Sequence, residues 1–254
     1  MKTLSIVIPA LNEEHGIGRV LEEIPIEKLK SMGYSVEVLV IDNGSHDKTP
    51  HIAREKGAKV IIQPIRGYGN AYKAGFANAT GDIIATGDAD LTYPFSILPD
   101  VIHLINDKGV DFINTDRLTT LNTGVMEGSH IWGNKLLTTT THLLFGWPFI
   151  DSQSGMWIFK RSIWKGLHVK SSGMPFSQEL KIEAYLRGFK CIEIPIDYRA
   201  RAGEVKLNTI KDGLGNIKQL VRKRLEFGLT LPSTFKDKSD ALANKEREFT
   251  TEVE

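Results

Sequence analysis

Two aspartates one residue apart, Asp88 and Asp90, follow a short apolar run and precede Pro94. In a partly desolvated site, carboxylates this close repel each other by roughly 4 kcal/mol at about 4 Å and an effective dielectric of about 20. A cation is therefore expected between them. The alternative is that one aspartate caps the helix that Pro94 opens and the other is solvated, which is the commoner situation for an isolated Asp-x-Asp.

The elements that position these carboxylates follow a repeated strand–helix pattern in the first half of the chain. The expected strands are residues 3–9, 36–42, 58–64, 82–86 and 110–114, and the expected helices are residues 13–24, 48–57, 70–81 and 95–109. Strands apolar on both faces and joined by helices predict a parallel sheet covered on both sides, with ligands beyond the carboxyl ends of the strands. Asp42, Arg66 and Asp88 each follow such an end, so they predict a site at one edge of the sheet.

The second half is less regular. A helix is expected near 129–145, a strand at 156–160, a helix at 177–188 and a strand at 191–198. No Pro- or Ser-rich linker separates the halves, which favours a single α/β domain. The charged stretch 236–254 is nearly free of large apolar residues and is expected to be disordered.

Composition sets wider limits. The 254 residues are 41% apolar and 25% charged, and the net charge of +1 predicts no general polyanion binding and no nucleic-acid partner. Cys191 is the single cysteine, so it forms no internal disulfide and indicates a reducing cytosolic setting. The apolar run 4–11 is too short to span a membrane and is interpreted as a strand, not a signal peptide.

Three classes of nucleotide-binding enzyme share this pattern but differ at the first loop. A dinucleotide-binding fold needs G-x-G-x-x-G after the first strand, where this chain has PALNEE, and Gly67-x-Gly69 comes only after the third strand. A P-loop needs Gly-Lys-Ser or Gly-Lys-Thr, and neither occurs. The Gly-rich, Arg-containing loop of nucleotidyltransferases is also missing after the first strand.

A set of motifs in order carries a family resemblance over roughly residues 4–208. The motifs are SIVIPALNEE, VIDNGSHDKT, IRGYGNAYKAG, GDADLTYP, DSQSGMWIFKR and SQELKIEAYLRGFKCIEIPIDYRARAGEVKL. The chain resembles a family 2 glycosyltransferase of the GT-A fold, nearest to the dolichyl-phosphate mannosyltransferase and polyprenyl-phosphate glucosyltransferase branch.

The resemblance implies a GT-A, Rossmann-like, mostly parallel sheet with helices on both faces. It divides the chain into a catalytic domain, 1–207, with a nucleotide-sugar half, 1–115, and an acceptor half, 116–207. A basic amphipathic helix and extension, 208–235, would follow. The donor is expected to be a UDP- or GDP-sugar, with the binding residues Pro9, Leu11, Glu13, Asp42, Arg66 and Asp88. Asp47 is expected to serve only the local turn and helix start.

By the same resemblance, Asp88 and Asp90 hold Mg²⁺ or Mn²⁺ on the diphosphate of the donor. Hard carboxylate oxygens suit either ion, and the metal would neutralise charge on the departing diphosphate. Thr92 stands where close relatives often have Gln as a further ligand, so Thr92 or a water would fill that place.

The acceptor implied is a polyprenyl phosphate, which is already an anion and needs cations instead of a general base. Arg117, Arg201 and Lys206 match the phosphate-binding positions, with Val205 where relatives usually have Ser. Asp151 is expected to orient sugar hydroxyls or an arginine, and it completes the expected catalytic set with Asp88, Asp90 and Arg117.

Two weaker candidates remain on the acceptor side. Were the acceptor a hydroxyl, Asp151 or Glu179 would be the base; Glu179 is otherwise interpreted as a charge on a helix surface. The histidines at 130, 142 and 168 have no metal-ligand spacing and are interpreted as structural.

Residues 208–227 cannot span a bilayer as a helix, because five of them are Lys or Arg and each costs roughly 3 kcal/mol at its centre. They carry one apolar stripe, Ile210, Leu214, Ile217, Val221 and Leu225, flanked by these bases. The stripe is consistent with an interfacial helix on anionic lipid or with a helix packed on its own domain behind a solvated basic face.

The hypothesis is a metal-dependent, inverting transferase that moves a hexose from a UDP- or GDP-sugar to a polyprenyl phosphate. It would be cytoplasmic and peripheral at the cytosolic membrane face. A hydroxyl acceptor on the same fold, or a non-catalytic nucleotide-sugar-binding protein, is the alternative. The sequence leaves the sugar, the choice between UDP and GDP, and the oligomeric state open.

Overall fold

The computed structural model describes residues 2–122, 124–126, 128–203 and 209–228, without the side chains of 209–212. The predictions for Lys206, for Val205 and for the stretch 236–254 lie outside the described residues.

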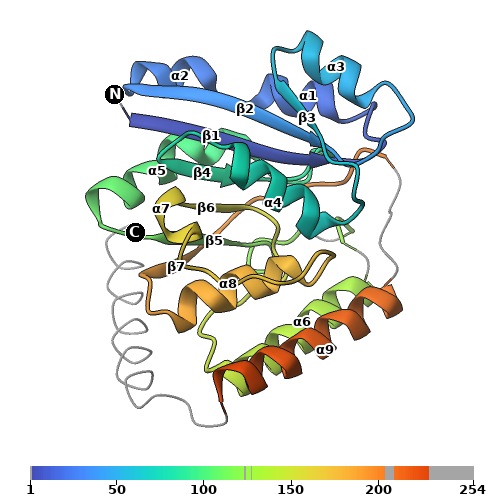
Figure 1. Ribbon diagram of the computed structural model, residues 1–254, viewed down its shortest axis with the longest axis vertical. Coiled ribbons are helices and arrows are strands. Elements are labelled where there is room, and N and C mark those ends of the chain that lie inside the picture. The colour runs from blue at the N-terminus through green and yellow to red at the C-terminus, as the bar shows by residue number, and fades with distance from the viewer. Residues whose placement is uncertain (1, 123, 127, 204–208, 229–254) are drawn as a thin grey trace.

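A seven-stranded sheet in the order β3-β2-β1-β4-β6-β5-β7 forms the centre of the molecule (Figure 1). Its strands are β1 (Lys2–Ala10), β2 (Tyr34–Asp42), β3 (Lys59–Ile62), β4 (Ile83–Thr86), β5 (Phe112–Asp116), β6 (Trp157–Lys160) and β7 (Cys191–Pro195). All neighbouring strands are parallel except β6, which lies antiparallel between β4 and β5. The prediction of a mostly parallel sheet is thus confirmed.

Helices cover both faces of the sheet because the inner strands are apolar on both faces. In β1, Leu4, Ile6 and Ile8 face a layer that contains α1 (Ile17–Glu23), α2 (Ile26–Ser31), α3 (Thr49–Glu55) and α5 (Leu98–Asp107). The alternate residue Val7 faces the opposite layer of α4 (Tyr68–Asn78), α7 (Arg161–Trp164) and α8 (Phe176–Leu186). The period of two in the strand thus divides its side chains between two cores.

Two long helices, α6 (Gly128–Phe145) and α9 (Thr209–Phe227), lie side by side outside these layers, at the lower edge of Figure 1. Leu137 and Phe145 of α6 pack with Leu220 of α9 and Ile182 of α8 in a small separate core. No helix within the described residues is long and apolar enough to cross a membrane.

Two short helices, α2 and α7, were not among the predicted elements, because stretches of four to six residues give little periodicity. The predicted helix at 95–109 is divided into a 3₁₀ turn, Phe95–Ile97, and α5. No side chain caps either segment, so neither Asp88 nor Asp90 serves as the helix cap that was the alternative role for one of them.

Candidate active site

Three strand ends bring Pro9, Asp42 and Asp88 to the carboxyl edge of the sheet, where the sequence analysis expected a site. Ala10, the last residue of β1, pairs in register with Asp42, the last residue of β2. Asp88 lies two residues beyond the end of β4, which pairs with β1 on its other side. Pro9 lies next to Ala10, opposite Ile41 of β2.

The turn after β1 carries Leu11 and Glu13, and its shape is unusual. Asn12 has a φ of 51°, in the left-handed region that few residues other than glycine adopt. The Glu13 amide donates to Thr49 Oγ1 at 2.7 Å, and its carbonyl accepts from the Ile17 amide at the start of α1. The turn therefore holds the Glu13 side chain close to Gly203, where an added Cβ would lie 3.5 Å from Glu13 Oε2.

Asp42 and Arg66 lie on adjacent loops that Asn43 connects. Asp42 is 4% exposed, and its Oδ1 accepts from the Ser45 amide at 3.1 Å. Asn43 Oδ1 accepts from the Gly67 amide at 2.7 Å, while its Nδ2 donates to the carbonyls at 63 and 65. Arg66 is exposed and donates to the Gly44 carbonyl at 3.2 Å. Asn43 was missed by the sequence analysis, although its place directly after Asp42 in VIDNGS was a usable signal.

Asp88 is held loosely at the centre of the site. Tyr68 donates to its Oδ1 at 3.4 Å. Burial and the neighbouring Asp90 raise the pKa of Asp88 to about 7, against the lowering effects of Arg201 and Arg117. Gly155 lies next to both side chains: a Cβ at this position would come within 2.7 Å of the Tyr68 hydroxyl and 3.5 Å of Asp88 Oδ2.

Asp90 is fixed much more firmly. Its Oδ1 accepts from the Thr92 amide at 3.1 Å and from Thr92 Oγ1 at 2.6 Å, across a turn in which Leu91 has a φ of 70°. Its Oδ2 lies 2.6 Å from Arg201 Nη2 in an ion pair, but accepts no hydrogen bond from any described residue. Thr92 therefore supports Asp90, and its hydroxyl is engaged with the carboxylate.

The segment 199–202, which follows β7, places Arg201 beside Asp90 and close enough to Asp88 for their charges to interact. The Arg199 amide donates to the Thr92 carbonyl at 3.1 Å, and the Ala202 amide donates to the Asp90 carbonyl at 2.9 Å. These backbone bonds set the Arg201 side chain beside Asp90, and its neighbours Asp90, Asp88 and Glu13 help to keep its pKa raised although burial opposes this. Glu13, Asp88, Asp90 and Arg201 thus form one electrostatic cluster.

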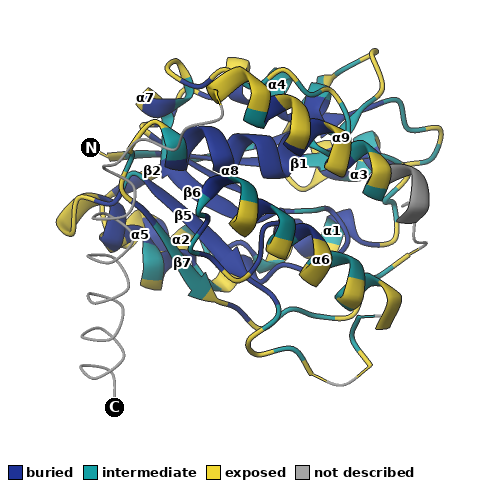
Figure 2. Ribbon diagram, turned by 90° about the horizontal axis from the view of Figure 1, so that it is seen from below, coloured by how far each residue is buried: buried dark blue, intermediate teal, exposed yellow. Residues whose placement is uncertain are grey.

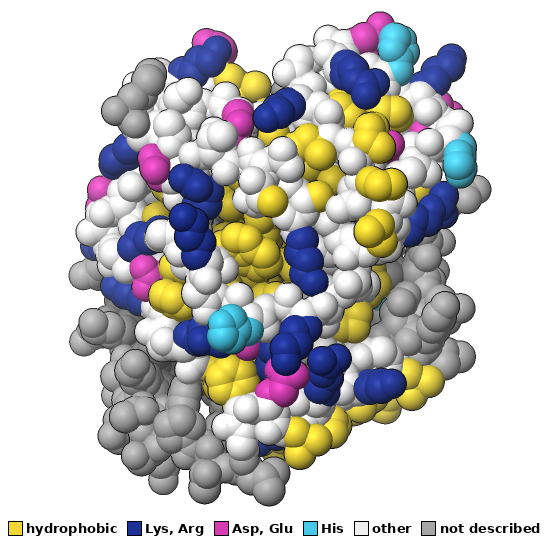
Figure 3. Space-filling model, in the orientation of Figure 1, with side chains coloured by type: hydrophobic (Ala, Val, Ile, Leu, Met, Phe, Trp, Pro, Cys, Tyr) yellow, Lys and Arg dark blue, Asp and Glu magenta, His cyan; other side chains and the backbone are white. Residues whose placement is uncertain are grey.

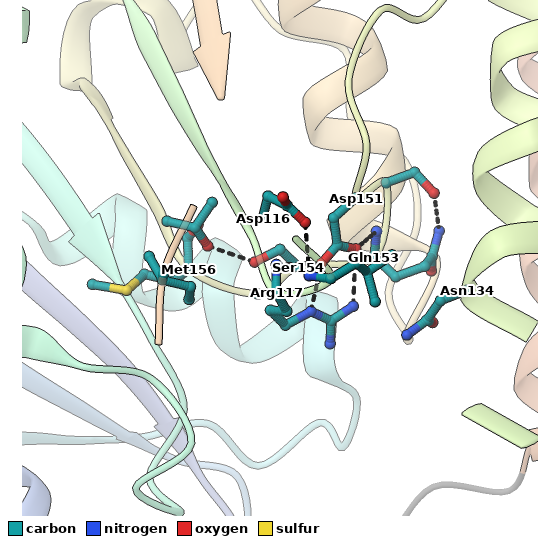
Figure 4. A network of polar contacts seen from close by, with 12 residues as sticks. Asp116, Arg117, Asn134, Asp151, Gln153, Ser154 and Met156 are labelled. Atoms are coloured by element: carbon teal, nitrogen blue, oxygen red, sulfur yellow. Dashed lines mark hydrogen bonds and ion pairs between the residues drawn. The ribbon is translucent and has the colours of Figure 1, made fainter. Parts of the chain in front are cut away.

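Arg117, which follows β5, and Asp151 form a buried, two-pronged ion pair (Figure 4). Arg117 Nε and Nη2 donate to Asp151 Oδ2 and Oδ1 at 2.7 and 3.0 Å, and the Arg117 amide adds a bond of 3.1 Å. Although burial opposes it, Arg117 lowers the pKa of Asp151, and the charge of Asp151 raises that of Arg117. The guanidinium also lies 5.4 Å from the centre of the Tyr198 ring.

The loop that carries Asp151 is held by three helices. Ser152 and Thr138 of α6 bond through their hydroxyls at 2.9 Å. Gln153 Nε2 donates to Gln178 of α8 at 3.1 Å, and Asn216 of α9 donates to Gln153 Oε1 at 3.3 Å.

Two further polar residues that the sequence analysis missed support this loop. Asn114 Nδ2 donates to the Asp151 carbonyl at 2.8 Å, and Lys181 Nζ donates to the Ser154 carbonyl at 2.8 Å. Burial lowers the pKa of Lys181 to about 7. A polar residue inside an apolar strand, as Asn114 is, was a usable signal. Lys181 gave none, since lysine is common on helices.

The interpretation of Glu179 as a surface charge is wrong. It is 2% exposed, its Oε1 lies 2.7 Å from Lys223 Nζ, and its Oε2 accepts from the amides of Lys170 and Ser171. Lys223 is only 1% exposed, so it is not part of the solvated basic face that was one interpretation of its helix. Glu179 therefore anchors α9 to α8 and has no contact that would make it a base.

The donor set suits a hard divalent cation such as Mg²⁺ or Mn²⁺. Asp90 Oδ2 is a buried carboxylate oxygen that accepts no hydrogen bond from the described residues and is paired with Arg201, and Asp88 supplies a second carboxylate beside it. Within the part of the chain that the structure describes, no group of three or more His, Cys, Asp or Glu is arranged to hold a metal. Such a cation would therefore take its other oxygens from a bound diphosphate or from water.

Comparison with known proteins identifies the family of the chain. Residues 5–167 match the family model described as glycosyl transferase family 2. The chain is 36% identical over 229 residues to a dolichyl-phosphate hexose transferase of Haloferax volcanii, covering 90% of this chain and 96% of that protein. It is 38% identical over 222 residues to the low-salt glycan biosynthesis hexosyltransferase Agl6 of the same organism, covering 85% of this chain and about half, 52%, of that longer protein.

Solved structures show the same fold. The chain superposes with a TM-score of 0.71 on glucosyl-3-phosphoglycerate synthase from Mycobacterium tuberculosis in complex with Mn²⁺, UDP-glucose and phosphoglyceric acid. The match covers 91% of this chain and 81% of that one, at 22% identity. The GT-A fold expected from the sequence motifs is thereby confirmed. With a family model over most of the chain and a relative matched along nearly its whole length, the chain belongs to glycosyl transferase family 2.

Proposed function

We propose that the protein transfers a hexose from a UDP- or GDP-sugar to a polyprenyl phosphate, with inversion at the anomeric carbon. One observation carries this proposal. Asp151, the buried carboxylate on the acceptor side, has both oxygens engaged by Arg117. A carboxylate with a lowered pKa and two guanidinium bonds is a poor general base, but it holds a cation firmly in place for an anionic acceptor.

The donor would bind in the half 1–115, at the edge formed by β1, β2 and β4. Asp42 has a carboxylate that suits the hydroxyl or N–H donors of a nucleoside, and Pro9, Leu11 and Glu13 would line the same pocket. Arg66, on the neighbouring loop, would face the anionic part of the donor. The Mycobacterium structure contains UDP-glucose on the same fold, which supports a nucleotide-sugar donor.

Asp88 and Asp90 would hold Mg²⁺ or Mn²⁺ on the diphosphate. The bound cation would supply charge neutralisation for the leaving nucleoside diphosphate. Thr92 keeps Asp90 in place for this role through its amide and hydroxyl, and Tyr68 steadies Asp88.

The reaction requires no proton transfer at the acceptor. One oxygen of the acceptor phosphate forms a bond to the anomeric carbon, while the bond from that carbon to the diphosphate breaks and its electron pair leaves with the nucleoside diphosphate. The acceptor phosphate is already ionised at neutral pH. Arg117, Arg201 and Lys206 in the half 116–207 would position it, which reduces the entropic part of the barrier.

The relative named dolichyl-phosphate hexose transferase supports this choice of acceptor, since the match runs over nearly all of both chains. A long polyprenyl chain stays in a bilayer while its phosphate enters the site. We therefore place the enzyme at the cytosolic membrane face, as a peripheral protein.

The test is nucleotide release from a panel of UDP- and GDP-sugars with Mg²⁺ or Mn²⁺, measured with and without a short-chain polyprenyl phosphate. Release that depends on the lipid phosphate is expected, and it would also identify the donor. Equal release without the lipid phosphate but with an added sugar alcohol would instead indicate a hydroxyl acceptor. No release with any donor would overturn the proposal.

A further inference from the structure

The outer faces of α6 and α9 carry large apolar side chains in contact with solvent. On α6, Trp132 is 71% exposed and Leu143 is 77% exposed, with Leu136 between them at 47%. Spacings of four and seven residues place these three side chains on one face of the helix. Figure 2, which views the molecule from below, shows exposed turns along both helices.

The same pattern occurs on α9. Its exposed apolar residues include Leu214, Ile217, Val221 and Leu225, with Leu214 and Leu225 at 64% and 66%. Their spacing again describes one face. Since α6 and α9 pack side by side, the two faces form one surface, which we name the α6–α9 face. An exposed apolar surface of this extent marks a site of interaction with another molecule or with a membrane.

Packing prevents this face from turning inward. The inner sides of both helices are already buried through Leu137, Phe145 and Leu220. Lys223 fixes the rotation of α9, because its Nζ lies 2.7 Å from Glu179 and 2.9 Å from Glu183 of α8. The apolar stripe of α9 is thus held outward by a buried ion-pair cluster.

A basic cavity of about 220 Å³ lies beside the apolar surface, between α9 and residues 170–175. Four cationic side chains, Lys170, Lys218, Arg222 and Lys223, line it together with Glu179 and Glu226. Lys170 and Arg222 pair with Glu226 at 2.9 and 3.2 Å, and Lys223 pairs with both acidic residues. Lys218 is exposed and makes no hydrogen bond or ion pair with another described residue. Figure 3 shows Lys and Arg side chains gathered next to apolar ones along this lower edge.

The charge of this surface decides between two kinds of partner. In a twofold dimer formed through the α6–α9 face, the basic cavity of one copy would lie close to the basic cavity of the other. Their like charges would repel each other. A bilayer that contains anionic lipids would accept the apolar side chains below the headgroups and place negative phosphates against Lys218, next to Arg222 in its pair with Glu226.

Hydrogen bonds also join the two helices of this face to the loop that carries Asp151. Thr138 of α6 bonds Ser152, and Asn216 of α9 bonds Gln153, in the loop whose Asp151 holds Arg117. A membrane on the α6–α9 face would thus lie one helix layer from the Arg117 guanidinium.

We propose that the α6–α9 face docks on a membrane and that the basic cavity beside it binds the phosphate headgroup of an anionic lipid. Docking itself is independent of the sugar chemistry. Only its purpose, to present a lipid acceptor to Arg117, rests on the proposed function.

The experiment is co-sedimentation of the full chain with phosphatidylcholine vesicles, with and without phosphatidylglycerol, in the absence of any sugar donor. We expect binding to the anionic vesicles that weakens as salt is added. Leu214→Gln with Leu225→Gln should reduce binding to vesicles of both compositions. Lys218→Glu should reduce binding only to anionic vesicles, by at least about fivefold, since each basic residue near the surface contributes about 1 kcal/mol.

Matched controls are Met32→Gln and Lys59→Glu, which change exposed residues of the same kinds far from α6 and α9 along the chain. Both should bind vesicles as the unchanged protein does, and all variants should show the same thermal melting. Asp88→Asn should also bind normally, so that a failure of catalysis and a failure of docking remain distinguishable. Absence of vesicle binding, or a dimer in sedimentation velocity that Leu225→Gln dissociates, would overturn the proposal.

Discussion

Asp88 and Asp90 have the same chemistry but different surroundings, and a substitution separates their roles. Asp90 is bonded to Thr92 and paired with Arg201, whereas Asp88 has one long bond from Tyr68. Asp88→Asn should therefore fold normally, because an amide oxygen still accepts from Tyr68. Its turnover should fall by about a hundredfold or more, since a charge that stabilises the leaving diphosphate is lost.

Nucleotide release and thermal melting measured on the same preparations check this prediction. Asp100→Asn, at an exposed position of α5, is the matched control and should retain full activity. An Asp88→Asn enzyme with near-normal turnover would remove Asp88 from the metal site.

Substitution of Asp151 distinguishes an anionic acceptor from a hydroxyl acceptor. Because Asp151 positions Arg117, Asp151→Asn should lower kcat but leave the acid limb of the pH profile in place, set by the acceptor phosphate. A general base would behave differently: its removal would abolish that limb. The measurement is kcat against pH for both proteins, and disappearance of the acid limb in the variant would favour a hydroxyl acceptor.

Lys181 should make the folded state sensitive to pH. Its pKa is lowered to about 7 from an ordinary value of 10.5. Between these values the unfolded chain keeps a proton that the folded chain has released, so the free energy of unfolding should rise with pH. Lys181→Met should flatten this rise, as measured by urea unfolding at several pH values. If the free energies of unfolding of the two proteins differed by the same amount at every pH, Lys181 would not be a buried amine that titrates in this range. Lys218→Met is the control at an exposed lysine.

At the scale of the element, one helix carries both a buried and an exposed lysine. Lys223→Ala would leave Glu179 buried without its cation and Glu183 with Arg187 alone, at a cost of about 3–5 kcal/mol. Lys218→Ala, on the exposed side, should change stability by less than about 0.5 kcal/mol. Hydrogen exchange along α9 should therefore accelerate in Lys223→Ala alone, and equal exchange in both variants would show that the buried cluster does not hold this helix.

The elements also show what periodicity can predict. The seven strands and the long helices were predicted because apolar periods of two and of 3.6 identify them locally. The antiparallel placement of β6 was not, since the side-chain pattern of an inner strand is the same in either direction. The chain between β5 and β6 contains the long helix α6, so it is long enough for β6 to run either parallel or antiparallel to β5.

At the scale of the whole molecule, the site was predictable where it depends on strand ends. Asp42 and Asp88 follow parallel strands, and such ends meet at one edge of a sheet. An arginine was one of the two partners expected for Asp151, but the sequence did not identify it as Arg117. The pairing of Glu179 with Lys223 was not predictable, because it joins residues far apart in the chain and depends on how α8 and α9 pack. The same packing exposes the apolar side of α9, which the sequence left open between contact with anionic lipid and packing on its own domain.

The central claim is that the acceptor atom is a phosphate oxygen of a polyprenyl phosphate. Its most direct test is mass spectrometry with ³¹P NMR of the lipid recovered after incubation with the donor sugar. The recovered lipid should be heavier by one hexose residue, with its phosphomonoester converted to a phosphodiester. An unchanged phosphomonoester, with the sugar released into water or attached to a hydroxyl, would contradict it.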